Sequence, residues 1–285
     1  MSSRIGVIGG SGLYSLFEGS IQYIPVDTPF GTPSDEFALG EISGKEVVFL
    51  PRHGRHHQYL PSEINYRANI FGMKKLGVGK IISISAVGSL KENLKPRDVV
   101  IVDQFFDRTT KRAQTFFGKG FVAHAAFGDP VCPAMRKTIL KTVQSLPGTF
   151  HAKGTYVNME GPQFSTRAES HYYRSFGFDV IGMTNLSEAR LAREAEICYT
   201  TLAFVTDYDC WKEDEAHVTT DMIIKVLKDN AENAKKIIAS VLRELDHPME
   251  SCTCHETLKT AMITDPKTLA GETRIRLFEL LKKYM

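Results

Sequence analysis

The chain has 285 residues, of which 42% are hydrophobic and 24% are charged, a composition typical of a folded globular protein. Its 35 Lys and Arg residues nearly balance 33 Asp and Glu residues, and no basic block stands out, which argues against a nucleic-acid partner. The first residues lack the apolar run of a signal peptide, and no run reaches the roughly 18 residues of a membrane helix. We therefore expect a cytoplasmic protein with no membrane partner.

Short strand-like runs alternate with helical patterns along the chain. The strand-like runs are almost continuously apolar, which is typical of strands covered by helices on both faces of a sheet. They lie at 4–10, 45–54, 80–89, 98–105, 154–162, 179–184 and 197–207. Helical patterns lie at 64–76, 132–146, 166–175, 186–196 and 221–246, and a shorter one lies near 272–283.

This alternation predicts an α/β fold with one mixed, mainly parallel sheet flanked by helices. No linker rich in Pro, Gly or Ser divides the chain, so residues 1–285 are expected to form a single domain. In such folds ligands bind at the carboxyl ends of the strands. The residues that carry the function should therefore directly follow the strands.

Two strand ends offer small residues that let an anion approach the backbone. The loop "GVIGGSGLY" at 6–14 exposes backbone N–H groups and adds the hydroxyl of Ser11, but it has neither Walker nor full dinucleotide-binding spacing. In "SISAVGS" at 83–89, Ser85 can donate from its hydroxyl and Ala86 from its backbone N–H. The alternatives are a tight turn in the first segment and close helix–sheet packing in the second.

The segment "PRHGRHH" at 51–57 is unusually rich in cationic side chains for a strand end. Arg52 can fork onto two phosphate oxygens, and His53 can donate a hydrogen bond beside it. An exposed basic turn is the ordinary alternative. The letters "RHG" also form the core of the histidine-type phosphatase motif, although that motif usually follows the first strand rather than the third.

Two further segments offer a surface for a flat, apolar ligand. Phe164 lies beside a Gly-Pro turn in "MEGPQFSTRAES" at 159–170, where its ring can stack on a base. Met183, in "GMTN" at 182–185, offers a soft apolar side chain at a strand end. Taken singly, such residues more often belong to a core than to a site.

The strand-like run before residue 207 ends in two carboxylates, in the stretch "FVTDYDCWKED" at 204–214. In an extended segment residues i and i+2 project to one side, so Asp207 and Asp209 should address the same ligand edge. A carboxylate accepts from an amino group, and a protonated one donates to a ring nitrogen. Burial and the neighbouring charge would raise the pKa of such a pair. A metal site would need further oxygen or histidine ligands, and no compelling set is visible.

The cysteines are Cys132, Cys198, Cys210, Cys252 and Cys254, an odd and scattered set that does not indicate a secreted disulfide framework. The stretch "CTCH" at 252–255 suggests a metal or redox site. Its spacing is one residue tighter than C-x-x-C, and no second ligand pair is obvious. We expect no bound metal.

Six segments together resemble one family. "IGVIGGSGLY", "DTPFGTPSD", "PRHGRHHQYLPSEINYRANIFG", "VNMEGPQFSTRAES", "GMTNLSEARLAREAEICY" and "VTDYDCW" closely resemble the 5′-methylthioadenosine phosphorylases of the trimeric purine nucleoside phosphorylase family, from about residue 4 to about residue 245. The resemblance implies that inorganic phosphate, as co-substrate, attacks C1′ of 5′-methylthioadenosine and releases adenine and 5-methylthioribose 1-phosphate. It implies a place in methionine salvage and polyamine metabolism, and no metal or organic cofactor.

The resemblance also implies roles for individual residues. Phosphate would be held by Ser11, Arg52, His53, Ser85, Ala86 and Thr184. Ribose would lie against Met183, and the purine beside Phe164 and Ser165. Candidates for the methylthio end are His57, His124, Thr220 and Ile223. The catalytic set would be His53 with Asp207, as the acid at purine N7, and Asp209, as its partner near N6.

The resemblance leaves several alternatives open. Related enzymes tend to carry valine where Thr220 stands, so a broader purine nucleoside phosphorylase that accepts adenosine is the nearest competitor. Phosphorylases of 6-oxopurines carry asparagine at the position of Asp207, which favours 6-aminopurines here. A non-catalytic nucleoside-binding protein is a rival from another class. The family implies a homotrimer or a hexamer of two trimers, and some relatives carry a disulfide at the position of Cys252 and Cys254.

Overall fold

The computed structural model describes residues 4–212, 220–245 and 252–285. Within these ranges, side-chain surroundings are described for all residues except Ser11, Tyr14, Ser15 and 220–232. No helix in the described part of the chain is both long and apolar enough to cross a membrane.

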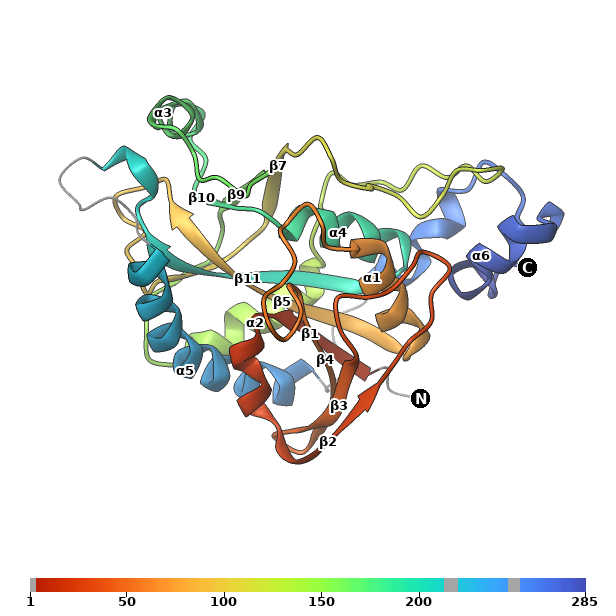
Figure 1. Cartoon of the computed structure of the whole chain (residues 1–285), viewed down its shortest axis with the longest axis horizontal. Coiled ribbons are helices and arrows are strands. Elements are labelled where there is room, and N and C mark those ends of the chain that lie inside the picture. Colours follow the sequence, from red (N-terminus) through yellow and green to blue (C-terminus); the bar gives the residue numbers. More distant parts are fainter. Residues whose placement is uncertain (1–3, 213–219, 246–251) are drawn as a thin grey trace.

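The described strands join one eleven-stranded sheet (Figure 1). Its main path runs in the order β2 (Glu18–Ile24), β3 (Phe37–Ile42), β4 (Lys45–Pro51), β1 (Arg4–Gly9), β5 (Val78–Ser89), β10 (Val180–Gly182), β9 (Thr155–Met159) and β7 (Gln104–Arg108). Off this path, β11 (Cys198–Asp207) pairs with β5 and with β6 (Val99–Ile101), which also pairs with β8 (Phe150–His151). β1 runs parallel to β4 and β5, and β11 runs parallel to β5, so the middle of the sheet is parallel as predicted.

Helices cover both faces of this sheet. The core on one face includes α2 (Pro133–Val143) and α5 (Thr220–Leu245), and the core on the other face includes α1 (Tyr66–Lys75), α4 (Asn185–Glu194) and α6 (Gly271–Leu281). α3 (Arg167–Ser175) lies apart from both sets of helices in Figure 1. Short 3₁₀ helices occupy η1 (Ser11–Leu16), η2 (Asp209–Trp211), η3 (Cys254–Thr260) and η4 (Pro266–Thr268).

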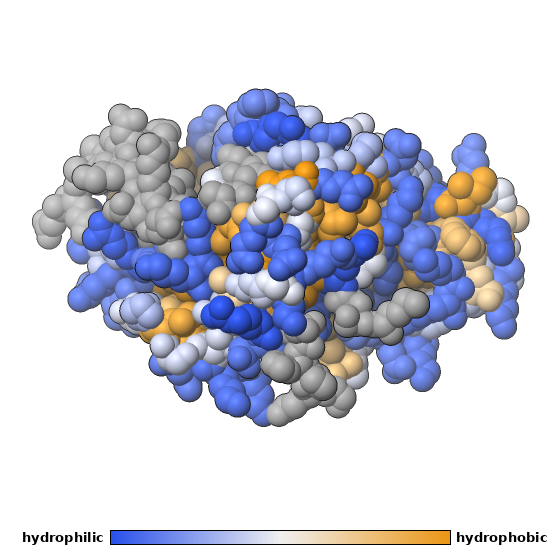
Figure 2. Space-filling model, turned by 90° about the horizontal axis from the view of Figure 1, so that it is seen from below, coloured by the Kyte–Doolittle hydropathy of each residue, from blue (hydrophilic) through white to orange (hydrophobic). Residues whose placement is uncertain are grey.

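The surface seen from below is largely hydrophilic, with hydrophobic residues near its centre and at the end that carries α6 (Figure 2). Several large hydrophobic side chains are at least partly exposed. They include Phe106, Tyr172 and Phe176, and on α6 Ile275 and Phe278.

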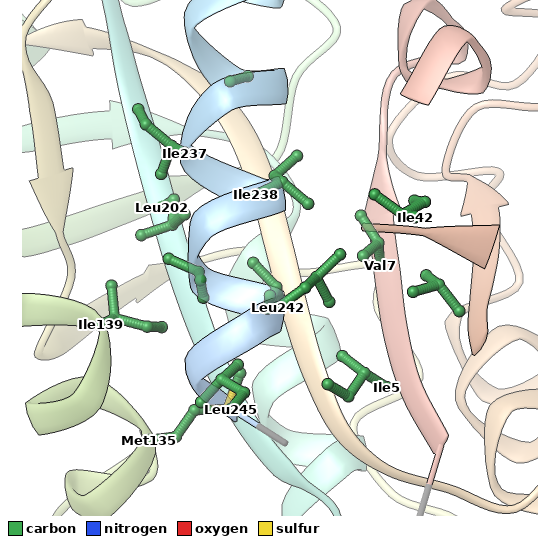
Figure 3. Close-up of a cluster of buried hydrophobic side chains, with 14 of the residues drawn as sticks. Ile5, Val7, Ile42, Met135, Ile139, Leu202, Ile237, Ile238, Leu242 and Leu245 are labelled. Atoms are coloured by element: carbon green, nitrogen blue, oxygen red, sulfur yellow. The ribbon is translucent and has the colours of Figure 1, made fainter. Parts of the chain in front are cut away.

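Side chains along the central strands alternate between the two cores because successive residues of a strand point to opposite faces. On β1, Ile5 and Val7 join the core beside α2 and α5, where Figure 3 shows them facing Ile238 and Leu242. The next residue along β1, Ile8, joins the core beside α1 and α4. This alternation explains why the central strands read as continuous apolar runs.

β5 brings the candidate segments together. Its residues Ser85 and Gly88 pair with Ala203 and Asp207 at the carboxyl end of β11. On its other side Gly88 pairs antiparallel with Ile181 of β10, so the residues that follow β10 run back toward Ser85. The strand ends that the sequence singled out therefore meet at one edge of the sheet.

Most of the predicted elements are confirmed, with shifts of a few residues at their ends. The single strand predicted at 98–105 is wrong, because the chain divides it into β6 and β7, which pair with different neighbours. The hairpin of β2 and β3 was not predicted, since β2 is largely exposed and lacks the apolar run used to find strands. All described strands share one sheet. That residues 1–285 form a single domain stays a prediction.

The packing of α5 against the sheet allows a prediction about stability. Leu242 is fully buried between α5 and the sheet, so Leu242→Ala should lower the free energy of unfolding by about 2–5 kcal/mol. Glu244, exposed on the same helix, supplies the control, because Glu244→Ala leaves the core intact. Urea denaturation measures both, and equal destabilisation by the two substitutions would contradict this packing.

Candidate active site

A buried ion pair joins the end of β4 to α4. The Arg52 guanidinium contacts both carboxylate oxygens of Glu188, through Nε to Oε1 and through Nη2 to Oε2 at 3.3 Å. Nη2 also donates to Ser83 Oγ at 2.7 Å, and Nη1 donates to the Ile84 carbonyl at 3.0 Å. Burial opposes the charge on Arg52, but the Glu188 carboxylate outweighs it and raises the pKa of Arg52 above its usual value. The pair is therefore a fixed, ionised element of the site.

This arrangement corrects the expected geometry of Arg52. The sequence predicted that its forked edge would face phosphate, but Glu188 already occupies the edge formed by Nε and Nη2. Arg52 can still act on an anion through its positive charge and through Nη1. Its backbone N–H donates to the Gly9 carbonyl at 2.9 Å, which fixes it beside the end of β1.

Asn185 connects the other predicted phosphate residues to this pair. Its Nδ2 donates to Ser83 Oγ at 2.9 Å, and its Oδ1 accepts from Thr184 Oγ1 at 3.0 Å. The same Oδ1 accepts from the Tyr156 hydroxyl at 3.3 Å, and that hydroxyl lies 3.1 Å from Ser85 Oγ. The network therefore joins Ser85 and Thr184 to the ion pair through Asn185 and Tyr156.

The first turn of α4 provides a site of positive potential. Thr184 is the N-cap residue of α4, but its side chain makes no capping hydrogen bond to the helix. The first backbone N–H groups of a helix lack partners within the helix, and the helix dipole favours an anion there. The antiparallel register of β10 and β5 brings Thr184 toward Ser85 and Ala86. Ala86 is exposed, so a ligand can reach this place.

His53 lies beside this edge as a neutral ring. Its Nδ1 is 2.8 Å from the Tyr59 carbonyl oxygen, which can only accept, so Nδ1 carries the proton and Nε2 is free to accept. Burial, aided by the positive charge of Arg52, lowers the pKa of His53 to about 4. The ring of His57 stacks on it with 4.4 Å between centroids. The predicted donation from His53 therefore requires protonation of Nε2, whereas a neutral His53 accepts a hydrogen bond from its ligand at Nε2.

The two aspartates meet by a different backbone path from the one predicted. Asp207 ends β11, and the chain then turns into η2, where Asp209 has a φ of 54°. The segment is not extended across both residues, so the expected i, i+2 geometry is wrong. The turn nevertheless directs the Asp209 backbone N–H to Asp207 Oδ1 at 2.7 Å. A Cβ added at Gly88 would lie 3.0 Å from Asp207 Oδ1, so glycine leaves room for this carboxylate.

The neighbours of the pair allow it to hold a proton. Burial and the nearby Asp207 carboxylate raise the pKa of Asp209, although Ser170 Oγ donates to its Oδ2 at 2.6 Å. Thr206 Oγ1 lies 2.6 Å from Asp207 Oδ2 and 3.1 Å from the Val87 carbonyl. A hydroxyl has one hydrogen, so when it donates to the carbonyl the short contact needs a proton on Asp207. The raised pKa of Asp209 therefore favours its protonated form beside the Asp207 carboxyl group.

The loop with the predicted purine residues lies against this pair. Cys210 Sγ donates to the Ser165 carbonyl at 3.2 Å, and Ser170 of α3 contacts Asp209. Phe164 is 55% exposed, so its ring is available to a ligand. Met183 packs close to Gly161 of the same loop, because a Cβ added at Gly161 would lie 2.6 Å from the Met183 Sδ.

The candidates for the methylthio end are not brought together by the described residues. His124 lines a cavity of about 630 Å³ with Phe121, Phe127 and Arg193, and His57 is not among the residues that line it. The side chains of Ser11, Thr220 and Ile223 lie outside the part of the structure that is described.

The residues that support the site were missed by the sequence analysis. Glu188, Asn185 and Ser83 hold the predicted residues in place, and Ser170 and Thr206 contact the two aspartates. One signal was present: polar side chains at buried positions of otherwise apolar segments need hydrogen-bond partners.

Comparison with known proteins gives consistent matches. The Phosphorylase superfamily matches residues 4–243. The S-methyl-5′-thioadenosine phosphorylase of Koribacter versatilis is 54% identical, and the match covers 100% of this chain and 97% of that protein. A crystal structure of methylthioadenosine phosphorylase from an Antarctic soil metagenomic library has a TM-score of 0.93 at 47% identity, covering 99% of this chain and 100% of that one. A variant of adenosine/methylthioadenosine phosphorylase from Schistosoma mansoni, in complex with adenine, has a TM-score of 0.85 at 33% identity, covering 92% and 99%.

The buried ion pair makes a sharp stability prediction. Glu188→Gln keeps the shape of the side chain but leaves the Arg52 cation buried without a counter-charge, which should cost about 3–5 kcal/mol of unfolding free energy. The same substitution at exposed Glu272 should change the stability little. Equal midpoints for Glu188→Gln and wild type in urea denaturation would refute the central role of this pair.

Proposed function

Because the chain belongs to the phosphorylase superfamily, and within it to the S-methyl-5′-thioadenosine phosphorylase family, we propose that it cleaves 5′-methylthioadenosine with inorganic phosphate. The products are adenine and 5-methylthioribose 1-phosphate, which assigns the enzyme to methionine salvage and polyamine metabolism. The observation that supports this reaction best is that β5 and β11 bring the cationic strand end at Arg52 together with a pair of aspartates, of which Asp209 has a raised pKa.

Phosphate binds at the edge formed by the ends of β1, β4 and β5. The Arg52 charge and the first turn of α4 attract it, with hydrogen bonds from Ser11, Ser85, Thr184 and the Ala86 backbone. A neutral His53 accepts a hydrogen bond at Nε2 from the hydroxyl group of monohydrogen phosphate. The other phosphate oxygens, which attack the sugar, stay anionic. The nucleophile is thereby positioned beside C1′ of the sugar.

The aspartate pair acts on the departing base. As the glycosidic bond breaks, negative charge develops on the purine, and a proton donated to N7 neutralises it. Asp207 is the donor to N7, and Asp209 accepts from the N6 amino group. Ser170 and Thr206 orient the two carboxyl groups, and Phe164 and Ser165 border the purine while Met183 lies against the ribose.

The second candidate function is that of a phosphorylase with a broader substrate range, which also accepts adenosine. One related structure is named an adenosine/methylthioadenosine phosphorylase, which favours keeping adenosine as an alternative substrate. His57, His124, Thr220 and Ile223 are the proposed neighbours of the 5′ group, and the hydroxyl of Thr220 would tolerate a polar one.

We also propose that the protein assembles as a homotrimer or as a hexamer of two trimers. Exposed aromatic side chains support an assembly: Phe176 is 62% exposed, and Phe106 stacks on Phe178 with 4.6 Å between ring centroids. His124 lines a cavity that His57 does not line, which is expected if His124 completes the site of a neighbouring subunit.

A comparison of three nucleosides tests the reaction. Release of free base from 5′-methylthioadenosine, adenosine and inosine should require phosphate and should be fastest for 5′-methylthioadenosine. Comparable rates with adenosine would establish the broader enzyme, and rapid cleavage of inosine would refute the role given to Asp207.

Two amide substitutions test the assignment within the aspartate pair. Asp207→Asn should lower kcat/KM for 5′-methylthioadenosine about 10²–10⁴-fold, because an amide cannot transfer the proton, and should favour inosine relative to adenosine. Asp209→Asn removes the carboxylate charge near N6 but keeps an amide oxygen that can accept from the amino group, so it should cost less. A larger loss for Asp209→Asn would transfer the role of acid to that residue.

The same pair predicts a pH dependence. A carboxylic acid donates only below its pKa. Asp207, the proposed donor, titrates together with Asp209, whose pKa is raised by burial and by Asp207. The kcat/KM of the wild type should therefore fall as the pH rises through the raised pKa of the pair. Asp207→Asn should flatten this fall, and an unchanged profile in that variant would show that another group causes it.

A further inference from the structure

Four of the five cysteines form a cluster far from the candidate active site. Cys132, Cys198, Cys252 and Cys254 place all their sulfur atoms within 4.8 Å of one another. Cys132, Cys198 and Cys254 are almost completely buried, and Cys252 is half-buried beside them. They belong to the core beside α2 and α5, part of which is drawn in Figure 3.

The cluster joins three separate segments of the chain. Cys132 is the N-cap residue of α2, and Cys198 begins β11. Cys254 begins η3, and Cys252 lies two residues before it. The Cys132 backbone N–H donates to the Tyr199 carbonyl at 2.9 Å, which fixes the first two cysteines relative to each other. Only the fold brings the four together, because their spacing in the sequence forms no recognisable ligand motif.

The arrangement fits a tetrahedral metal site better than two separate pairs. Four sulfur atoms at about 2.3 Å from one zinc ion lie about 3.8 Å from one another. In the structure every sulfur lies within 4.8 Å of the other three, and the distance from Cys198 to Cys252 is 3.4 Å. All four are free thiols, and a disulfide would need a sulfur–sulfur distance of about 2.05 Å. A small contraction around one ion satisfies all four groups at once.

We propose that Cys132, Cys198, Cys252 and Cys254 bind one Zn²⁺ ion as four thiolates, each of which releases its proton on binding. Four protein ligands leave no open coordination position, so the site is structural and not catalytic. β11 has 10 residues, so at about 3.3 Å per residue the ion lies roughly 30 Å along the strand from Asp207.

The ion would hold η3 and the start of α2 onto the first residue of β11. Glu196, two residues before Cys198, already ties η3 to the start of β11, since its Oε1 accepts from the Leu258 backbone N–H at 2.9 Å; the same oxygen accepts from the Tyr284 hydroxyl at 2.7 Å. His255 lies outside the four sulfurs, with Nδ1 3.0 Å from the Glu196 carbonyl and Nε2 3.6 Å from Cys198 Sγ. Outer groups of this kind orient the ligands of a metal site.

Zinc content is the direct test. The full chain, expressed with added zinc and purified with a reductant, should contain about one zinc per chain by atomic emission. Cys252→Ser should lose the zinc because it removes one of the four ligands. This position is chosen because Cys252 is half-buried and can be replaced with little disturbance of the core. Cys210→Ser, which removes the one cysteine outside the cluster, is the matched control and should keep the metal.

Cobalt provides a spectroscopic test. Co²⁺ added to the reduced, metal-free wild type should produce the thiolate charge-transfer and visible bands of a tetrahedral sulfur site, and Cys252→Ser should not produce them in full. A chelator should lower the melting temperature of the zinc-loaded wild type but not that of Cys252→Ser.

Three outcomes would overturn the proposal. These are a reduced wild type that binds neither metal, equal zinc in Cys252→Ser and Cys210→Ser, or two disulfides found by mass spectrometry of alkylated, unreduced protein. None of these outcomes depends on the proposed phosphorolysis, because the readouts do not involve turnover.

Discussion

The ion pair between Arg52 and Glu188 is the interaction on which the rest of the site depends. It connects the end of β4 to α4 across the ends of β1 and β5, at a place where both side chains are shielded from water. An isolated charge there would be very costly, so each partner requires the other. Because the pair fixes α4, it also fixes the first turn of that helix, which provides the positive potential beside Ser85 and Ala86.

The two aspartates likewise influence each other's charge. Each carboxyl group is close enough to the other to make a second negative charge unfavourable, and each has a hydroxyl partner in Thr206 or Ser170. The turn at Asp209 and the missing side chain of Gly88 create this proximity. Burial and the Asp207 carboxylate raise the pKa of Asp209, which is the direction that the proposed role of the pair as an acid for the purine requires.

The sequence was sufficient for the architecture, because buried parallel strands leave an apolar signature, and it located the strand ends where the candidate residues lie. The sequence analysis failed for two parts of the sheet. It missed the hairpin of β2 and β3, because β2 is largely exposed and lacks the apolar run by which strands were found. It also missed the division of 98–105, which depends on the neighbours with which β6 and β7 pair.

Side-chain roles were harder to predict than positions. Arg52 was found as a cationic residue at a strand end, but its partner Glu188 lies 136 residues away, so no local pattern showed that its forked edge was occupied. The tautomer of His53 depends on the Tyr59 carbonyl, and the cysteine cluster depends on the packing of three segments. Such relations arise only when the chain is folded.

The most direct test of the account is to follow the phosphorus during turnover of 5′-methylthioadenosine. Phosphorus NMR of the reaction should show inorganic phosphate converted to a sugar 1-phosphate in step with the release of adenine. Release of adenine with phosphate left unchanged would mean that water is the nucleophile, and the role of the strand edge as a phosphate site would be contradicted.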